Sequence, residues 1–177
     1  MTPQHIQADD NDEMDLVDKD DRVIGTINQA DAPSLLETKA GLIRGTVAFV
    51  QNEEGKIWTP RRAANKRIAP SGLDFSVAEH VQAGESYQSG IIRGFKEELF
   101  LNVDKSHLNF LGKLDPLPHL PYFFTGVFLY HANEVKEYNQ ADFTGFEWLS
   151  PGEIIERIDN GEPSKSALKT ALKNFLQ

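Results

Sequence analysis

Short runs in which apolar and polar residues alternate recur along the chain, and this alternation is typical of half-buried β-strands. The clearest case is the segment 42–62, where residues 46–50 alternate between two faces and the turn sequence NEEG precedes a second apolar run, KIWT. This pattern predicts two antiparallel strands joined by a hairpin. The acidic sequence DKDD between the apolar runs of residues 14–27 predicts another hairpin.

Three later segments are rich in aromatic and β-branched residues and predict further strands. They cover residues 108–114, 122–132 and 143–150. Between the first two lies DPLPHLP, residues 115–121, whose three prolines exclude regular structure. The segment 73–81, LDFSVAEHV, is short and mixed, and we expect it to form a loop that enters the following helix.

Helical periodicity marks the remaining segments. An apolar residue recurs every four positions over residues 86–100, which predicts a helix with one buried side and with Ser86 as its N-cap. The residues of this stripe are Tyr87, Ile91, Phe95 and Leu99. The sequence SPGE at 150–153 has the pattern of a helix start and predicts a helix to about residue 159. A final amphipathic helix is expected in 164–177, and a short one in 32–39.

Strands in hairpins that are interleaved with about three helices indicate an α+β or a mixed-sheet α/β domain. A chain of 177 residues, 40% of them hydrophobic, buries one core and does not require a second domain. We therefore expect a single domain over residues 13–177. Residues 1–12 are acidic and lack apolar periodicity, so we expect them to form a flexible tail.

Charge and composition narrow the function classes. The 18 basic and 27 acidic residues leave a net charge of −9, which argues against a polynucleotide or an anionic membrane as partner. Because the chain has no Cys, disulfides, thiolate nucleophiles and Cys-based zinc sites are excluded. The lack of Cys, of a secretion signal and of a long apolar run fits a cytoplasmic protein without a membrane partner.

The predicted helix 86–100 carries the candidate chemistry. Glu97 and Glu98 are adjacent carboxylates, hard oxygen ligands of the kind that hold Mg²⁺ beside substrate phosphates. A Glu-Glu pair is also common on a solvated helix face. Gly90 and Gly94 lie one turn apart beside these glutamates, and each glycine costs about 1 kcal/mol relative to Ala in a helix interior. The glycines indicate either close packing or space for a ligand.

Residues 79–101 resemble the Nudix box, the signature of hydrolases that cleave a nucleoside diphosphate linked to another group. That signature reads Gly-x5-Glu-x7-Arg-Glu-aliphatic-x-Glu-Glu-x-Gly-aliphatic. The positions that match it without a gap are Glu85, Arg93, Phe95, Glu97, Glu98 and Leu101. Three positions depart from it, because Glu79 stands for the opening Gly, Gly94 for the Glu after the Arg, and Phe100 for the late Gly.

The resemblance extends beyond the box to most of residues 13–177. The segments MDLVDKDDRVIGT, GKIWTPRRA, GLDFSVAEHVQAGES and FEWLSPGEI are similar to the Nudix subgroup related to isopentenyl-diphosphate isomerase. The resemblance implies an α/β/α sandwich with a mixed central sheet, in which the box forms a loop, a helix and a loop on one side.

The resemblance also implies a chemistry. Box carboxylates in the family bind Mg²⁺ (or Mn²⁺), which bridges a diphosphate, and a glutamate helps to activate the attacking water. Glu98 is the first choice as metal ligand and Glu97 the second. Arg93 in this position braces the box by pairing with a glutamate, for which Glu85 is the expected partner. The substrate would be a small phosphoanhydride, and a homodimer is left open.

Gly94 stands where the family places a glutamate that ligates metal or acts as a base, and glycine does neither. Glu79 is the candidate that compensates for this loss, with Asp142 and Glu147 as weaker ones.

Three functions therefore remain for the structure to address. The leading one is metal-dependent hydrolysis of a nucleoside diphosphate derivative. The second is a Nudix-fold module that binds a nucleotide or a protein without hydrolysis. The third, isopentenyl-diphosphate isomerisation, is disfavoured because it depends on a cysteine, which this chain lacks.

Overall fold

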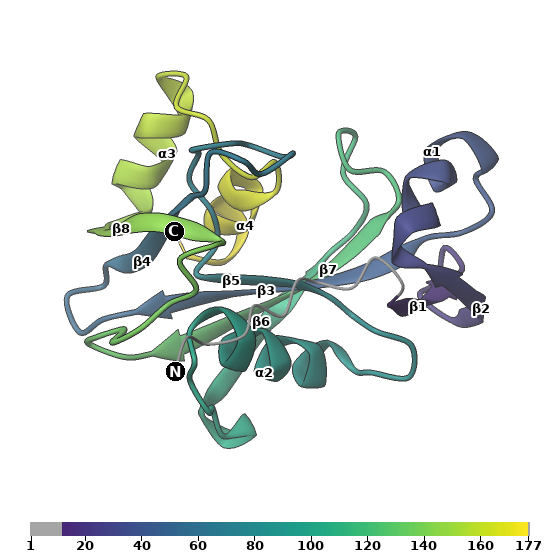
Figure 1. The fold of residues 1–177 in the computed structure, drawn as a ribbon, viewed down its shortest axis with the longest axis horizontal. Coiled ribbons are helices and arrows are strands. Elements are labelled where there is room, and N and C mark those ends of the chain that lie inside the picture. Colours follow the sequence, from purple (N-terminus) through teal and green to yellow (C-terminus); the bar gives the residue numbers. More distant parts are fainter. Residues whose placement is uncertain (1–11, 177) are drawn as a thin grey trace.

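A mixed six-stranded sheet forms the centre of the protein in a computed structural model, which describes residues 12–176 (Figure 1). Five strands follow the order β6-β7-β3-β4-β8, and β5 pairs with β3 beside this path. Their bounds are β3 Ile43–Gln51, β4 Ile57–Arg62, β5 Val77–His80, β6 Leu108–Leu114, β7 Phe123–His131 and β8 Phe143–Leu149. The predicted hairpin over residues 42–62 is confirmed as β3 and β4, with Gln51 opposite Ile57.

The central pair of strands, β3 and β7, is parallel, and the other pairs are antiparallel. Strand β5 pairs with the first half of β3, from Gly45 opposite His80 to Ala48 opposite Val77. Strand β4 pairs with the end of β3, at Gln51, along the same edge. The two strands β5 and β4 therefore follow one another along one edge of β3. Among the described residues β5 has β3 as its one partner strand, and its other edge is open to side chains from the helices.

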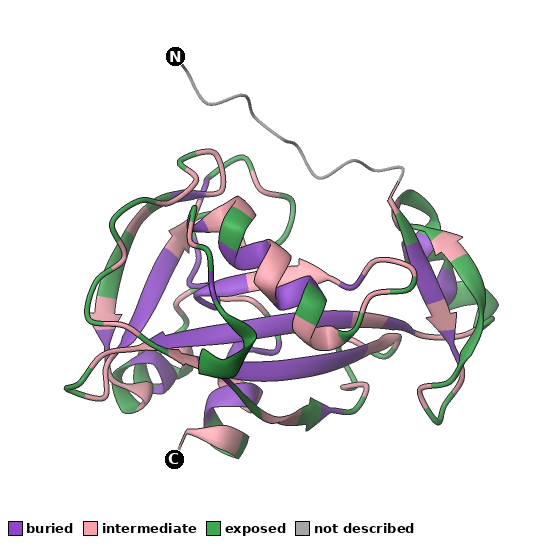
Figure 2. Cartoon of the chain, turned by 90° about the horizontal axis from the view of Figure 1, so that it is seen from below, coloured by how far each residue is buried: buried purple, intermediate pink, exposed green. Residues whose placement is uncertain are grey.

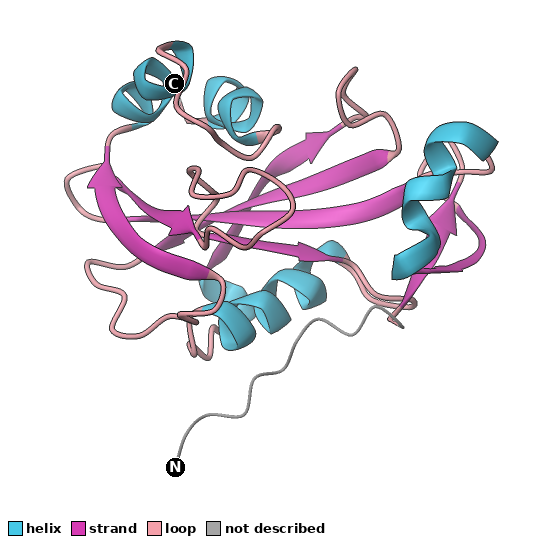
Figure 3. Cartoon of the chain, turned by 45° about the horizontal axis from the view of Figure 1, so that its top comes forward, coloured by secondary structure: helices cyan, strands magenta, loops and turns pink. Residues whose placement is uncertain are grey.

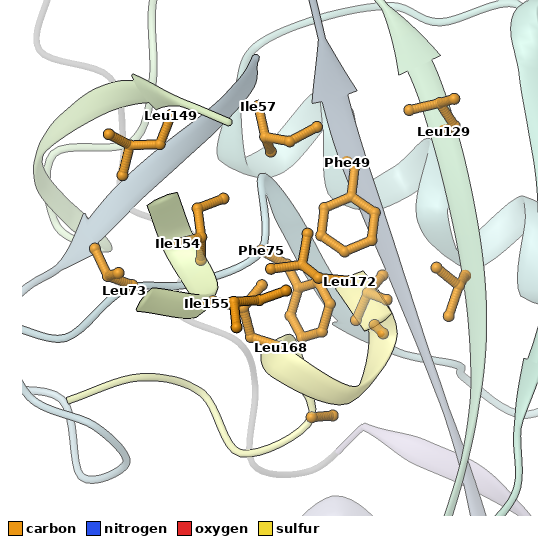
Figure 4. Packing of buried hydrophobic residues seen from close by; sticks show 14 of the residues in the cluster. Phe49, Ile57, Leu73, Phe75, Leu129, Leu149, Ile154, Ile155, Leu168 and Leu172 are labelled. Atoms are coloured by element: carbon orange, nitrogen blue, oxygen red, sulfur yellow. The ribbon is translucent and has the colours of Figure 1, made fainter. Parts of the chain in front are cut away.

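Helices cover both faces of the sheet, as Figure 3 shows. Helix α2 (Tyr87–Glu98) packs on one face, and α3 (Pro151–Asp159) and α4 (Leu168–Phe175) pack on the other. Each face has its own apolar core. The core under α3 and α4 includes Phe49 and Phe75, whose ring centroids are 5.4 Å apart (Figure 4). The predicted α/β/α sandwich with a mixed central sheet is thus confirmed.

The α2 helix follows the predicted stripe. Ile91, Phe95 and Leu99 are buried against the sheet, while the outward side of the helix is exposed (Figure 2). The helix begins after Ser86, whose hydroxyl accepts a hydrogen bond from the Ser89 amide, as the sequence predicted for an N-cap. Helix α3 likewise begins after Ser150 with the expected capping box.

A smaller unit packs beside the main sheet at the start of β3. It consists of the predicted hairpin β1 (Glu13–Val17) and β2 (Val23–Asn28), the 3₁₀ turn η1 (Gln29–Ser34) and the short helix α1 (Leu35–Thr38). Arg44 on β3 binds this unit, because its Nε and Nη2 donate to the Asp21 carboxylate and carbonyl, both at 2.6 Å. Tyr87 and Lys113 also donate to the Asp21 carboxylate, at 2.9 and 2.8 Å. The β1–β2 hairpin, β3, α2 and β6 therefore meet at one partly buried charge.

Two sequence predictions need correction. The segment expected to be a loop before α2 contains strand β5, because its short, mixed pattern gives no alternation strong enough to identify a strand. The last helix begins at Leu168 and not near residue 164, because the Pro163 carbonyl and the Lys165 amide bond to the backbone of Leu73 in a β-bridge instead. Of the expected flexible tail, residues 1–11 lie outside the described residues.

Helices long and apolar enough to span a bilayer are absent from residues 12–176.

Candidate active site

The candidate site lies where the end of α2 meets the open edge of β5. The predicted residues are brought to it from three places: Glu79 from β5, Glu85 from the turn before α2, and Arg93, Glu97 and Glu98 from α2. Helix α2 fixes these positions because its apolar stripe is locked against the sheet. Its charged residues therefore project toward β5 and solvent.

Arg93 is the centre of an ion-pair network. Its Nε and Nη2 donate to the two oxygens of Glu85, each at 3.2 Å, in the bidentate arrangement that a guanidinium favours. Its Nη1 donates to Glu79 at 3.1 Å and to Glu97 at 3.3 Å. Its Nη2 also donates to the His80 carbonyl at 2.7 Å, so the arginine joins α2 to β5 and to the turn between them. The Arg93–Glu85 pair expected from the resemblance is present.

Glu79, within this network, and Glu98, beside it, lie where nearby negative charge is not fully balanced by cations. Burial raises the pKa of Glu79 to about 6, and Arg93 only partly opposes this rise. Burial and the nearby charges of Glu79 and Asp74 raise the pKa of Glu98 well above its ordinary value. Glu98 accepts a weak hydrogen bond from the Ala78 amide on the open edge of β5, at 3.4 Å. Both groups would gain from a bound cation, which is the electrostatic character of a metal site.

The glycine at position 94 is explained by close packing against β5. A Cβ atom at Gly94 would lie 2.6 Å from Cγ of Glu79 and 2.8 Å from Cγ1 of Val77, both closer than real contacts allow. The Glu79 side chain thus occupies the space into which a residue at position 94 would extend. The sequence analysis placed Glu79 on a loop, which is wrong, since it lies within strand β5.

The two departures at positions 79 and 94 therefore belong together. The Nudix signature has Gly at the first position and Glu at the second, and this chain has them the other way round. Because the two positions touch across the helix–strand contact, the exchange keeps one glutamate and one glycine at the interface. A carboxylate remains at the site, reached from the strand instead of the helix.

The third departure, Phe100, lies just after α2 and has a φ of 52°. This left-handed conformation explains why the signature has glycine here, because a Cβ is disfavoured in it. The turn closes by hydrogen bonds from the Leu99 and Leu101 amides to the Phe95 carbonyl, each at 3.1 Å. Phe100 thus keeps the glycine-type turn at a cost in backbone strain.

The weaker candidates are arranged differently. Glu147 lies outside the cluster and accepts from both Arg157 nitrogens at 2.9 Å, which lowers its pKa. Asp142 is paired with Lys66 but contributes to the negative field at Glu98. The sequence analysis missed two further charged residues near the cluster, Asp74 and Lys165. Lys165 belongs to no motif, and Asp74 lies in the segment GLDFSVAEHVQAGES outside the Nudix box, so neither was marked as a site residue.

His80 follows Glu79 on β5 and lies on the opposite face of the strand. Burial lowers its pKa to about 4, with Lys165 and Arg93 adding to the effect, so its imidazole is neutral at pH 7. Its ring packs on Phe123 with centroids 5.6 Å apart. A neutral imidazole in an aromatic contact is a wall of the site, and it adds no charge to the carboxylate cluster.

The donor set fits a metal ion that arrives with substrate. Within residues 12–176, no group of three or more His, Cys, Asp or Glu side chains is arranged to hold an ion by itself. The pair Glu79 and Glu98 offers two carboxylates, and Mg²⁺ commonly takes one or two carboxylates and completes its shell with water and phosphate oxygens. Glu79 and Glu98 would therefore hold such an ion in an open site and not in a closed protein cage.

Comparisons with known proteins identify the family of this chain. The NUDIX domain family model matches residues 41–171. An uncharacterised Nudix hydrolase of Nostoc sp. is 38% identical over 92% of this chain and 94% of its own length. A crystal structure of a Deinococcus radiodurans protein superimposes with a TM-score of 0.79 at 31% identity, over 93% of this chain and 99% of that one.

A weaker likeness links the chain to isopentenyl-diphosphate Delta-isomerase of Salmonella heidelberg, at 27% identity over 84% of this chain and 78% of that protein. This level of identity supports the expected subgroup only weakly. The domain match and the Nostoc relative cover most of the chain, including the helix and strand that build the carboxylate cluster. The chain therefore belongs to the Nudix family and is a Nudix-type hydrolase.

Proposed function

We propose that the protein hydrolyses a phosphoanhydride bond in a small nucleoside diphosphate derivative with the help of Mg²⁺ or Mn²⁺. The observation that carries this proposal is the meeting of two partly buried carboxylates at the open edge of β5, Glu79 on the strand and Glu98 bonded to the Ala78 amide, which lack a full complement of positive charge. A divalent ion supplies that charge, neutralises a diphosphate and lowers the pKa of bound water. The neighbouring residues of α2 and β5 orient the two carboxylates.

Each residue of the site has a distinct part in this proposal. Glu98 and Glu79 hold the ion, Glu98 from the end of α2 and Glu79 from β5. Arg93 keeps Glu79 in place by its hydrogen bond of 3.1 Å and ties Glu85 to the start of the helix. Glu97 has a side chain that is 39% exposed and shares Arg93, which suits an outer ligand or an acceptor for bound water.

The test is hydrolysis of a panel of nucleoside diphosphate derivatives with Mg²⁺ or Mn²⁺, read as released phosphate or diphosphate. Glu98→Gln keeps the size of the side chain but removes its charge, so we expect a loss of activity of at least about 100-fold, the usual contribution of one such group. Glu147→Gln is the matched control, since its carboxylate is bound by Arg157 at the surface and should be dispensable.

Two results would contradict the proposal. Activity that survives Glu98→Gln unchanged would remove the carboxylate cluster as the active site. A wild-type protein that turns over no member of a broad panel, with either metal, would favour the alternative of a Nudix-fold binding module. Isomerisation is not proposed, because the cysteine on which it depends is missing from the sequence.

A further inference from the structure

A cavity of about 150 Å³ lies on the α4 side of the sheet, against the strand that carries Glu79. Its walls come from β3, β5, β7 and the segment before α4, and most of the lining side chains are apolar, among them Val47, Phe75 and Phe123. It therefore accommodates at least a compact group of a ligand.

Lys165 lines this cavity together with Glu79 and His80, and its backbone is held firmly. The Lys165 amide donates to the Leu73 carbonyl at 2.9 Å, and the Lys165 carbonyl accepts from the Leu168 amide at 3.1 Å. These bonds anchor the residue between the start of α4 and the segment that leads into β5. The ammonium group thus extends from an anchored backbone.

The charge of Lys165 is only weakly used within residues 12–176. Its one ion-pair partner there is Asp74, at 4.0 Å, and Asp74 is already bound by Arg62. The Lys165 side chain is 29% exposed, so a ligand has access to it. Burial raises the pKa of Glu79 and of Glu98, and the positive charge of Lys165 opposes part of this rise.

The charges of a bound diphosphate supply the argument for a ligand. Glu79 and Glu98 together cancel the charge of one divalent ion, so most of the substrate's own negative charge remains to be neutralised. Arg93 is not available for this, because Glu79, Glu85 and Glu97 occupy its guanidinium. Of the described residues that line the cavity, Lys165 is the one with a positive charge.

We propose that Lys165 binds a phosphoryl oxygen of the substrate on the side away from α2, while the cavity receives the compact, largely apolar group next to that phosphate. This inference rests on the proposed function, and it places a phosphate of the proposed substrate on the α4 side of the site. It adds a specificity residue outside the Nudix signature.

Lys165→Met and Lys165→Arg test the proposal, with Lys169→Met as the matched control. Lys169 lies on α4 and its ammonium pairs with Asp159 at the surface, so its removal changes the net charge equally. The first readout is calorimetric binding of imidodiphosphate, which is not hydrolysed, in the presence of Mg²⁺. We expect Lys165→Met to weaken binding by about 10- to 100-fold, the range for one hydrogen bond to a charged group.

The second readout separates KM from kcat for a substrate found in the panel. Lys165→Met should raise KM by at least about tenfold with a smaller change in kcat, because the ammonium binds the ground state as well as the transition state. Lys165→Arg should recover most of the affinity, and Lys169→Met should match the wild type. Thermal unfolding of each variant confirms that the fold is kept.

Lys165 could instead serve only as a counter-ion for the two glutamates. Lys165→Met would then bind Mg²⁺ more tightly and imidodiphosphate with unchanged or higher affinity, and that result would overturn the inference. Absence of imidodiphosphate binding to the wild type would overturn it as well. Lys165-dependent binding by a wild type that hydrolyses nothing would support the anion site and reject the proposed function, so the two failures are distinguishable.

Discussion

The double variant Glu79→Gly, Gly94→Glu restores the order of the Nudix signature. It tests the contact between α2 and β5 directly. Gly94→Glu alone places a Cβ 2.6 Å from Cγ of Glu79 and 2.8 Å from Cγ1 of Val77. Overpacking of this kind costs about 1–3 kcal/mol. Replacement of a glycine within a helix stabilises the fold by up to about 1 kcal/mol. We expect a net loss in the free energy of unfolding of about 1–2 kcal/mol.

Glu79→Gly alone should change stability little but weaken metal binding. A carboxyl group whose pKa is raised from 4.5 to about 6 destabilises the fold by about 2 kcal/mol at neutral pH. Removal of the carboxyl group relieves this cost. Glycine within a strand, however, destabilises the fold by about 0.5–1 kcal/mol, and the hydrogen bond to Arg93 is lost. We therefore expect stability within about 1 kcal/mol of the wild type, together with weaker Mg²⁺ binding.

The double variant should be more stable than the sum of its parts. Removal of the Glu79 side chain abolishes the contact at 2.6 Å, whereas the Val77 methyl group remains, so relief is partial. We expect a favourable coupling free energy of about 1 kcal/mol in urea unfolding. Hydrolysis and Mg²⁺ affinity should exceed those of Glu79→Gly by at least about tenfold, because a carboxylate is again present.

A matched control uses the other glycine on the same face of α2. A Cβ at Gly90 would lie 3.3 Å from Thr46 and 3.4 Å from Glu85, so Gly90→Ala should be tolerated better. Glu79→Gly should not change the effect of Gly90→Ala. Additive effects of Glu79→Gly and Gly94→Glu, within about 0.5 kcal/mol, would refute the claim that these two side chains compete for one space.

Three further predictions concern the surroundings of the site. Phe100→Gly should raise the free energy of unfolding by about 0.5–1 kcal/mol, because it relieves a left-handed backbone at an exposed side chain; a lower urea midpoint would contradict this. Mg²⁺ should raise Tm more at pH 7.5 than at pH 5.5, since Glu79, with a pKa of about 6, must ionise to bind the ion; an equal shift at both pH values would exclude Glu79 as a ligand. Asp21→Asn should destabilise the protein by about 1–3 kcal/mol at pH 7, because its hydrogen bonds to Arg44 and Lys113 are charged. Although burial opposes them, these bonds lower the folded-state pKa of Asp21, so its contribution is present above the ordinary pKa and is lost as the pH falls through the folded value. The difference between Asp21→Asn and wild type should therefore shrink in acid, and a difference independent of pH would contradict the assignment.

Local patterns along the chain were enough to identify most elements. The alternation in 42–62, the stripe from Tyr87 to Leu99 and the capping box at Ser150 each involve residues within a few positions of one another. Their physics is local, because hairpin turns, caps and amphipathic stripes depend on neighbours along the backbone. The spacing of Glu85, Arg93 and Glu98 on and before one helix was predictable for the same reason.

The tertiary structure alone decided how the carboxylates are used. Strand β5 has too short a pattern to be recognised, and it becomes a strand by pairing with β3 some thirty residues earlier. That pairing places Glu79 against Gly94 and turns two apparent defects of the signature into one exchange. Lys165 reaches the same region from more than sixty residues beyond α2, by bonds to Leu73. Contacts between residues far apart in the chain depend on the packed fold, whereas the carboxylates of the helix were already apparent from their spacing.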